Sequence, residues 1–123
     1  PIEIVGVVST GAPAYARSFE YRESVERPAR TELADGLACR KPEPMALEII
    51  LAHVARIVEV TDEDIADAMR LVFSSTHTVV EGAGAAGVAA MLREKNQLAG
   101  RKVATVLCGA NVDRHVFAKV LSA

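Results

Sequence analysis

A nearly continuous run of β-branched residues opens the chain. Residues 2–8 read Ile-Glu-Ile-Val-Gly-Val-Val, and only a glutamate and a glycine interrupt the apolar side chains. Such a run is typical of a strand that is buried on both faces of a parallel sheet. A second apolar run occupies residues 102–107. Because helices are expected between the two runs, we predict parallel strands at 2–8 and 102–107 in one sheet.

Between these runs, apolar residues recur with helical spacing. One such set falls at positions i, i+3, i+4 and i+7, and it consists of Leu47, Ile50, Leu51 and Val54. The predicted helices cover residues 12–20, 44–55, 83–97 and 112–121, with a further helix after Thr61, and short strands are predicted at 57–60 and 78–81. Alternating helices and strands predict an α/β architecture, with a parallel sheet flanked by helices.

Thr61 is predicted to be the N-cap of the helix that follows it. The acidic residues 62–64 fill the first turn, where negative charge offsets the positive end of the helix dipole. This run is therefore a helix start rather than a pair of catalytic carboxylates. The residues expected to face inward in this helix are Ile65, Met69, Val72 and Phe73. Those expected to face inward in the helix at 83–97 are Val88, Met91 and Leu92.

The composition argues against several classes of partner. The 123 residues carry a formal net charge of −2, without basic clusters or interleaved aromatic residues, which disfavours nucleic acid and charged membrane surfaces. No apolar run approaches the about 20 residues that span a bilayer. Cys39 and Cys108 lie far apart and form no CxxC motif. We therefore expect a protein of the reduced cytoplasm.

The first candidate site is Gly82-Ala83-Gly84-Ala85-Ala86-Gly87, a G-x-G-x-x-G pattern at a predicted helix start. A dinucleotide-binding turn would need a carboxylate about 20 residues later, at the end of the next strand. The next predicted strand ends at Leu107-Cys108 without one, which argues against a dinucleotide. Two explanations stay open. The glycines either allow close helix packing, or let the backbone approach a flat cofactor or substrate, with Glu81 beside it.

The second candidate site is the turn Cys108-Gly109-Ala110-Asn111, which follows the predicted strand at 102–107. Ligands of open α/β sheets bind at the carboxyl ends of strands. The small residues would admit a ligand, and a thiol can make a weak hydrogen bond. A buried structural cysteine is the alternative. A nucleophilic cysteine is disfavoured because no base is adjacent in the sequence, although folding could bring His77 or His115 near it.

Two further features carry no site by themselves. Ala34-Asp35-Gly36 is a turn signal and nothing more. The three histidines, His53, His77 and His115, lack the spacing of metal ligands, so each is expected to be an ordinary surface or core residue.

The order of the motifs is more informative than any one of them. In chain order they are Val5-Gly6-Val7, Gly11-Ala12-Pro13-Ala14, Leu33-Ala34-Asp35-Gly36, Val60-Thr61-Asp62-Glu63-Asp64-Ile65 with Ala68-Met69-Arg70, Val80-Glu81-Gly82-Ala83-Gly84-Ala85-Ala86, and Val106-Leu107-Cys108-Gly109-Ala110-Asn111-Val112-Asp113. This order resembles the second half of the threonine dehydratase, serine dehydratase and serine racemase family, which are pyridoxal 5'-phosphate (PLP) enzymes of fold type II. The resemblance covers essentially the whole chain. It implies a tryptophan synthase beta-like α/β fold, in which residues 1–123 are the C-terminal portion of the large catalytic domain.

The resemblance implies cofactor-binding roles for five residues, namely Gly36, Glu81, Cys108, Gly109 and Asn111. In the family, the first residue of an S-G-G-N or S-G-A-N motif hydrogen-bonds the pyridine nitrogen of PLP, and Cys108 holds that position. Glu81 takes the place of a glutamate near the cofactor ring, and Gly36 that of a glycine whose backbone lies beside the cofactor. A neutral thiol cannot hold the ring nitrogen protonated as a carboxylate would, which suits β-elimination over transamination.

Two family features are absent from the sequence. Metal-binding members carry a glutamate and an aspartate where this chain has Val8 and Ala14, so no divalent-cation site is expected. The motif of the PLP-binding lysine, similar to S-F-K-x-R-G, and the glycine run that holds the phosphate are also missing. The lysines of this chain, Lys41, Lys95, Lys102 and Lys119, lie in other contexts. The resemblance puts both motifs upstream of Pro1, so we expect no catalytic residue here and no activity from this chain alone.

The resemblance implies a PLP-dependent lyase that converts L-threonine, L-serine or a related β-hydroxy amino acid to a 2-oxo acid and ammonia. Its partners would be that amino acid and the missing N-terminal half of the enzyme. Apolar surface that this half normally covers would favour homo-oligomers. A free-standing α/β binding or assembly module without catalysis is the alternative, and the joint presence of the Cys108 and Glu81 motifs argues against it.

Overall fold

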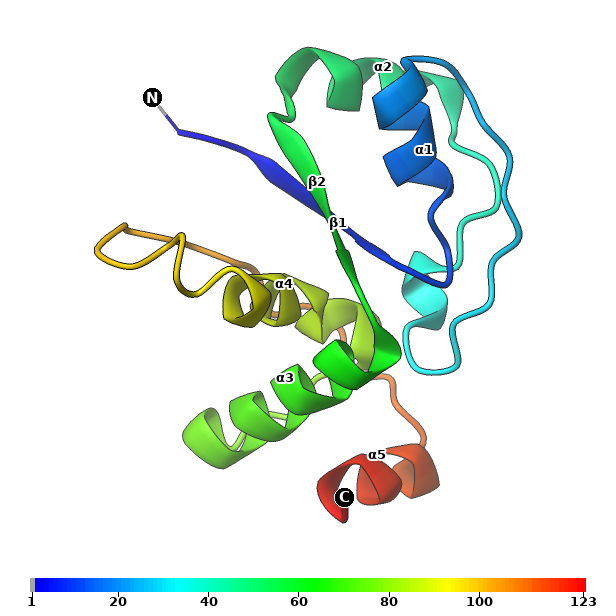
Figure 1. Cartoon of the computed structure of the whole chain (residues 1–123). Helices are drawn as coiled ribbons and strands as arrows, with labels where there is room; N and C mark the ends of the chain where they lie inside the picture. The colour runs from blue at the N-terminus through cyan, green and yellow to red at the C-terminus, as the bar shows by residue number, and fades with distance from the viewer. Residues whose placement is uncertain (1) are drawn as a thin grey trace.

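The computed structural model describes residues 2–123 as two strands surrounded by helices (Figure 1). The elements are β1 (Val5–Ser9), α1 (Ala14–Tyr21), the 3₁₀ helix η1 (Asp35–Leu37), α2 (Pro44–His53), β2 (Arg56–Val60), α3 (Asp62–Thr76), α4 (Gly82–Arg93) and α5 (Arg114–Leu121). Helices α1 and α2 lie on one side of the strands, and α3 and α4 lie on the other (Figure 1). The predicted α/β architecture is confirmed. Within residues 2–123, no helix has the length and apolarity to cross a membrane.

The two strands pair in parallel. The register joins Val5 to Arg56 and Ser9 to Val60. Burial increases toward the carboxyl end of β1, where Val8 and Ser9 are buried, whereas Ile2 and Ile4 before the strand are 94% and 51% exposed. The strand predicted at 57–60 is confirmed. The prediction of a strand buried on both faces throughout 2–8 is wrong, because this described sheet has only two strands and leaves the first residues uncovered.

Residues 102–107 do not form a strand, which corrects the prediction that they share a sheet with residues 2–8. Within the described residues, their backbone groups make no hydrogen bond. The apolar side chains of Val103, Val106 and Leu107 are 43%, 76% and 41% exposed. A strand forms only by hydrogen bonding to a neighbouring strand, so this segment has the composition of a strand without its partner. The short strand predicted at 78–81 is likewise absent.

Helix α3 begins with a reciprocal cap. Thr61 Oγ1 accepts the backbone N–H of Asp64 at 3.1 Å, and the Asp64 carboxylate accepts the Thr61 N–H at 2.9 Å. The backbone hydrogen bond from Thr61 is the largest cause that lowers the pKa of Asp64 below its ordinary value. The predicted stripe is confirmed for its buried members, Ile65, Met69 and Val72. Phe73 is half-buried and packs edge to face on Phe117 of α5, with ring centroids 5.5 Å apart.

Helix α4 turns a face of alanine and glycine toward the core. Its buried residues are Gly82, Gly84, Ala85, Ala86, Ala89 and Ala90. This corrects the prediction that its larger apolar residues face inward. Val88 packs only partly against the core, Met91 lines a surface cavity and Leu92 is 37% exposed. Small side chains occupy the inner face of α4 because they let the helix backbone lie close to its neighbours at interior packing density.

Each glycine of the G-x-G-x-x-G pattern lies against a different part of the chain. A Cβ on Gly82 would overlap the backbone carbonyl of Leu33. On Gly84 it would overlap the backbone carbonyl of Cys108, and on Gly87 the hydroxyl of Thr105. These contacts support the helix-packing explanation of the pattern. They also show how segments far apart in the sequence come to lie on one helix.

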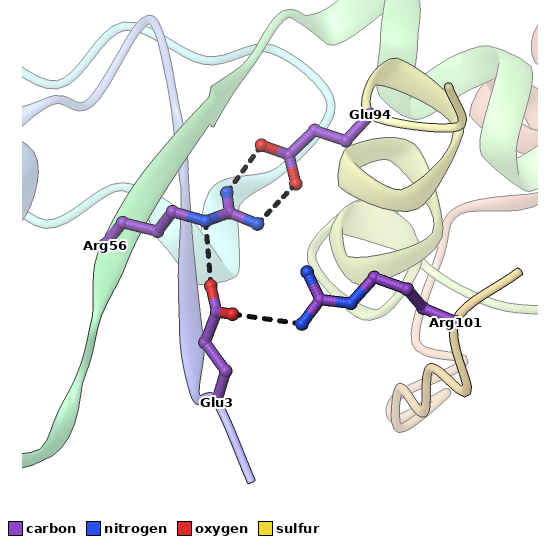
Figure 2. Close-up of polar contacts among 4 residues, drawn as sticks. All are labelled: Glu3, Arg56, Glu94 and Arg101. Carbon is purple, nitrogen blue, oxygen red and sulfur yellow. Dashed lines mark hydrogen bonds and ion pairs between the residues drawn. The ribbon is translucent and has the colours of Figure 1, made fainter. Parts of the chain in front are cut away.

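Four charged side chains tie the start of the chain to β2 and to the end of α4 (Figure 2). Arg56 donates to both carboxylate oxygens of Glu94 at 2.5 and 2.8 Å, and to Glu3 at 3.2 Å. Arg101 donates to the second oxygen of Glu3 at 3.2 Å. Two-point pairing of guanidinium and carboxylate is geometrically specific. It therefore fixes the carboxyl end of α4 relative to β2.

The capping box of α3 gives a prediction about stability. Thr61→Ala is expected to lower the free energy of unfolding by about 1 kcal/mol, because a cap hydroxyl is lost. The Asp64 contribution should depend on pH. Its folded pKa lies below the unfolded value of about 3.9, so this stabilisation is full above that pH and declines as the pH falls through the folded pKa. Urea unfolding from about pH 7 to about pH 3 checks this, and an Asp64→Asn variant that loses stability as steeply as wild type would contradict it.

The packing of α4 gives a second prediction. Gly84→Ala is expected to lower the free energy of unfolding by about 1–2 kcal/mol, since the overlap with a backbone carbonyl outweighs the about 1 kcal/mol that alanine contributes through helix propensity. Gly87→Ala is the matched control, because its Cβ would meet a hydroxyl that can move, and a smaller loss or a gain is expected. Chemical denaturation measures both variants, and equal losses would argue against the packing explanation.

Candidate cofactor site

The loop between α1 and α2 passes the carboxyl ends of both strands. Shortly after β1, the carbonyl of Gly11 accepts the N–H of Arg30 at 2.7 Å. Directly after β2, the carboxylate of Asp62 accepts the hydroxyl of Thr31 at 2.7 Å and the N–H of Glu32 at 2.9 Å. The loop is thus anchored beside each strand before it reaches the Ala34-Asp35-Gly36 turn.

Gly36 lies against the first turn of α4. The neighbouring Leu33 carbonyl sits where a Cβ of Gly82 would lie, and a Cβ on Gly36 would come within 2.8 Å of the Ala83 Cβ. Asp35 Oδ1 accepts the Gly36 N–H at 2.9 Å, and Gly36 itself is exposed. Glycine at this position therefore permits close approach to α4 while its backbone stays open to solvent.

Glu81 precedes the first turn of α4 and contacts the Cys108-Gly109-Ala110-Asn111 turn twice. Its N–H donates to the carbonyl of Gly109 at 3.0 Å, and its Oε2 accepts the N–H of Asn111 at 3.0 Å. Its Oε1 lies 4.0 Å from the position of a Cβ on Gly36. Glu81 therefore stands between the two loop segments that the sequence singled out.

Cys108 is an exposed residue and forms no disulfide. The adjacent Gly109 has φ +77°, a left-handed conformation that glycine adopts without strain. No hydrogen bond in the described part of the chain joins Cys108 to a histidine, and His77 and His115 are both exposed. The exposure argues against a buried structural cysteine, and nothing in this geometry supports a nucleophile.

The five predicted site residues thus lie at one place, the start of α4. The segments that meet there are the 34–36 turn, Glu81 and the 108–111 turn. Val8 and Ala14, at the positions where metal-binding members of the family carry carboxylates, are both buried and apolar, so they offer no oxygen ligand. Residues 2–123 contain no group of three His, Cys, Asp or Glu residues that could hold a metal ion.

The residues present fit one edge of a flat ring. They offer small exposed residues and a thiol that can hydrogen-bond a ring nitrogen. The described lysines all lie outside the three segments, and each is exposed. Neither of two surface cavities is lined by these segments, because one lies beside α2 and the other between β1, α4 and residues 102–105. The site is therefore an open surface, and the 34–36 turn, Glu81 and the 108–111 turn form one side of it.

Sequence reasoning missed the residues that hold these loops in place. Asp62 is predicted only as a first-turn acid, yet its carboxylate also anchors Thr31 across 31 positions of sequence. Ala83 forms the surface against which Gly36 packs. Neither contact has a local sequence signal, because each joins segments that only the fold brings together.

Comparison with known proteins agrees with this geometry. The family described as pyridoxal-phosphate dependent enzyme matches residues 1–109. An L-threonine ammonia-lyase of Thermotoga maritima is 33% identical over 121 residues, covering 98% of this chain and 30% of the relative. A phenylserine dehydratase of Ralstonia pickettii is 36% identical over 120 residues, covering 97% of this chain and 37% of the relative. The chain therefore spans about a third of the length of these curated relatives.

Solved structures share the fold. A threonine deaminase from T.th. superposes with a TM-score of 0.83 at 32% identity, covering 90% of this chain and 37% of that chain. A serine racemase from Dictyostelium discoideum superposes with a TM-score of 0.80 at 27% identity, covering 91% of this chain and 36% of that chain. These structural neighbours are fold-type II enzymes. Because the family match covers most of the sequence, the chain belongs to the family of pyridoxal-phosphate dependent enzymes.

Proposed function

We propose that this chain forms one wall of the PLP site in a lyase that acts on β-hydroxy amino acids such as threonine or serine. In this proposal, residues 1–123 are the C-terminal portion of the large catalytic domain. The observation that carries it is the convergence of Gly36, Glu81 and the 108–111 turn at the start of α4. This place lies beside the carboxyl ends of two parallel strands, where ligands of α/β sheets bind.

Cys108 would face the pyridine nitrogen of the cofactor. A neutral thiol offers a weak hydrogen bond and no negative charge, so it does not hold that nitrogen protonated. PLP, when bound, withdraws electrons from the α-carbon of an amino acid. The exposed backbone at Gly36 and Gly109 would lie along the flat ring, with Asn111 held at the end of the same turn.

The substrate class is supported by the relatives. Threonine and phenylserine, which name two of them, are both amino acids with a hydroxyl group on the β-carbon. Elimination of the α-proton and the β-hydroxyl releases water, and hydrolysis of the product consumes water and releases ammonia. The net products are a 2-oxo acid and ammonia, and no oxidant or reductant is required.

The amine and the phosphate-binding groups would come from a part of the protein outside these 123 residues. The relatives are much longer, since this chain covers 30% and 37% of the two enzymes compared above. None of the described lysines belongs to the site segments. The chain would therefore orient the cofactor ring, while the proton transfer at the α-carbon is performed by a lysine supplied elsewhere.

Unpaired backbone supports one docking place for that other part of the protein. A cavity of about 470 Å³ lies between Val5 and Val7 of β1 and residues 102–105, with Gly87 and Ala90 of α4 also lining it. An extended segment whose backbone groups are unpaired accepts an added strand. We propose that an extended segment of the remaining protein fills this groove and pairs with residues 102–107. In its absence, the same apolar surface would favour self-association.

Two coarser expectations remain part of the proposal. The relatives are enzymes by name, which favours catalysis over the alternative of a binding or assembly module. Cys39 and Cys108 are both free, which fits a reducing compartment such as the cytoplasm.

The role of Cys108 is tested in the product of the complete reading frame. Cys108→Ser is expected to keep PLP bound and to retain much of the activity, because a hydroxyl can make the same hydrogen bond. Cys108→Ala is expected to weaken PLP binding by about 1 kcal/mol, the usual net contribution of one hydrogen bond. Fluorescence titration with PLP measures the affinity, and ammonia release from threonine measures turnover.

Cys39→Ala is the matched control. The Cys39 thiol donates to the carbonyl of Lys41 at 3.1 Å and lies outside the three site segments, so PLP affinity should not change. If Cys108→Ser were the more damaging change and Cys108→Ala were silent, the sulfur would serve packing, and the proposed cofactor role would be wrong.

A further inference from the structure

Glu81 differs from the residues that begin two other helices. Glu43 before α2 and Thr61 before α3 each accept a hydrogen bond from their own first turn, from Ala46 at 2.9 Å and Asp64 at 3.1 Å. Glu81 occupies the same N-cap position of α4, but its side chain makes no capping hydrogen bond. Its carboxylate instead reaches away from the helix, to the N–H of Asn111.

The two hydrogen bonds of Glu81 bracket the tip of the 108–111 turn. One binds the carbonyl of Gly109 and the other the N–H of Asn111, so Ala110 lies between two fixed points. The N–H of Val112 donates to the carbonyl of Ala110 at 2.9 Å and closes the turn. A Cβ on Gly109 would overlap the Glu81 carboxylate, so the glycine and the carboxylate are fitted to each other.

The turn has few other anchors. Residues 102–108, which lead into it, make no backbone hydrogen bond within the described structure. The backbone carbonyl of Cys108 rests on Gly84, which sets the distance of this residue from α4, while the residues that follow it are held by Glu81. A hydrogen bond to an ionised carboxylate is about twice as strong as one between neutral groups. Glu81 therefore makes two of the hydrogen bonds that hold this turn, one through its backbone and one through its carboxylate.

We propose that Glu81 is a positioning residue that acts on the cofactor through the turn it clamps, by fixing the direction of the Cys108 thiol. This role rests on the proposed function of Cys108. The clamp, meaning the hydrogen bonds of Glu81 to Gly109 and Asn111, is present in this chain whether or not Cys108 binds the cofactor. The two can therefore be tested separately.

The clamp is tested by NMR on the ¹⁵N-labelled chain. Glu81→Gln and the shorter Glu81→Asp are expected to move the Asn111 amide proton upfield and to speed its hydrogen exchange by about tenfold, because a charge-assisted hydrogen bond is weakened or lost. Glu63→Gln is the matched control, an exposed acid in the first turn of α3, and it should leave Asn111 unchanged. An Asn111 amide that is unaffected in both Glu81 variants overturns the proposal.

The action through Cys108 is tested by a double-mutant cycle in the PLP-loaded product of the complete reading frame. Glu81→Gln should weaken PLP binding about fivefold, but less than about twofold when Cys108 is already alanine, because the group that it positions is absent. Equal effects in both backgrounds would show that Glu81 acts independently of the thiol and would overturn the proposal. If Cys108→Ala alone did not change PLP affinity, the proposed site and the positioning role would both fail, while the NMR result would still report the clamp.

Discussion

Close packing of small residues around the first turns of α4 is the constraint on which the rest of the structure depends. Gly82 receives the backbone of Leu33, Gly84 that of Cys108, and Gly87 the side chain of Thr105. The loop before the helix and the segment after it therefore meet on one short surface. A side chain at Gly82 or Gly84 would overlap a backbone carbonyl and separate these segments, whereas one at Gly87 would meet only the Thr105 side chain. The same contacts that build the core thus bring the candidate site together.

Much of this arrangement could be predicted from the sequence, where the signal is local. Thr61 and its acidic neighbours predict a helix start, and Thr61 is the N-cap, with a second hydrogen bond through Asp64 that this pattern does not predict. Other features depend on partners that spacing cannot reveal. Hydrophobicity favours Val88, Met91 and Leu92 for the inner face of α4, but alanine and glycine occupy it because closeness matters more there than side-chain area. Residues 102–107 have strand composition, yet pairing decides whether a strand forms.

Residues 102–107 and the candidate site are both exposed for the same reason: neither has a structural partner within residues 2–123. In the proposed site, the Cys108 thiol and the backbone at Gly36 would form one wall, and the described lysines lie elsewhere. Parallel strands gather their carboxyl ends at one edge of a sheet, so a strand added beside β1 would also bring its following loop toward this wall. The same added segment is then expected to complete both the sheet and the cofactor site.

The most direct test is the absorbance spectrum of PLP, recorded with this chain alone and with the product of the complete reading frame, together with ammonia release from threonine. We predict the spectrum of free PLP and no turnover for the chain alone, and a lysine-bound PLP band with ammonia release for the complete product. A stable PLP band with turnover from these 123 residues, or a complete product that neither binds PLP nor releases ammonia, would contradict the division of the site proposed here.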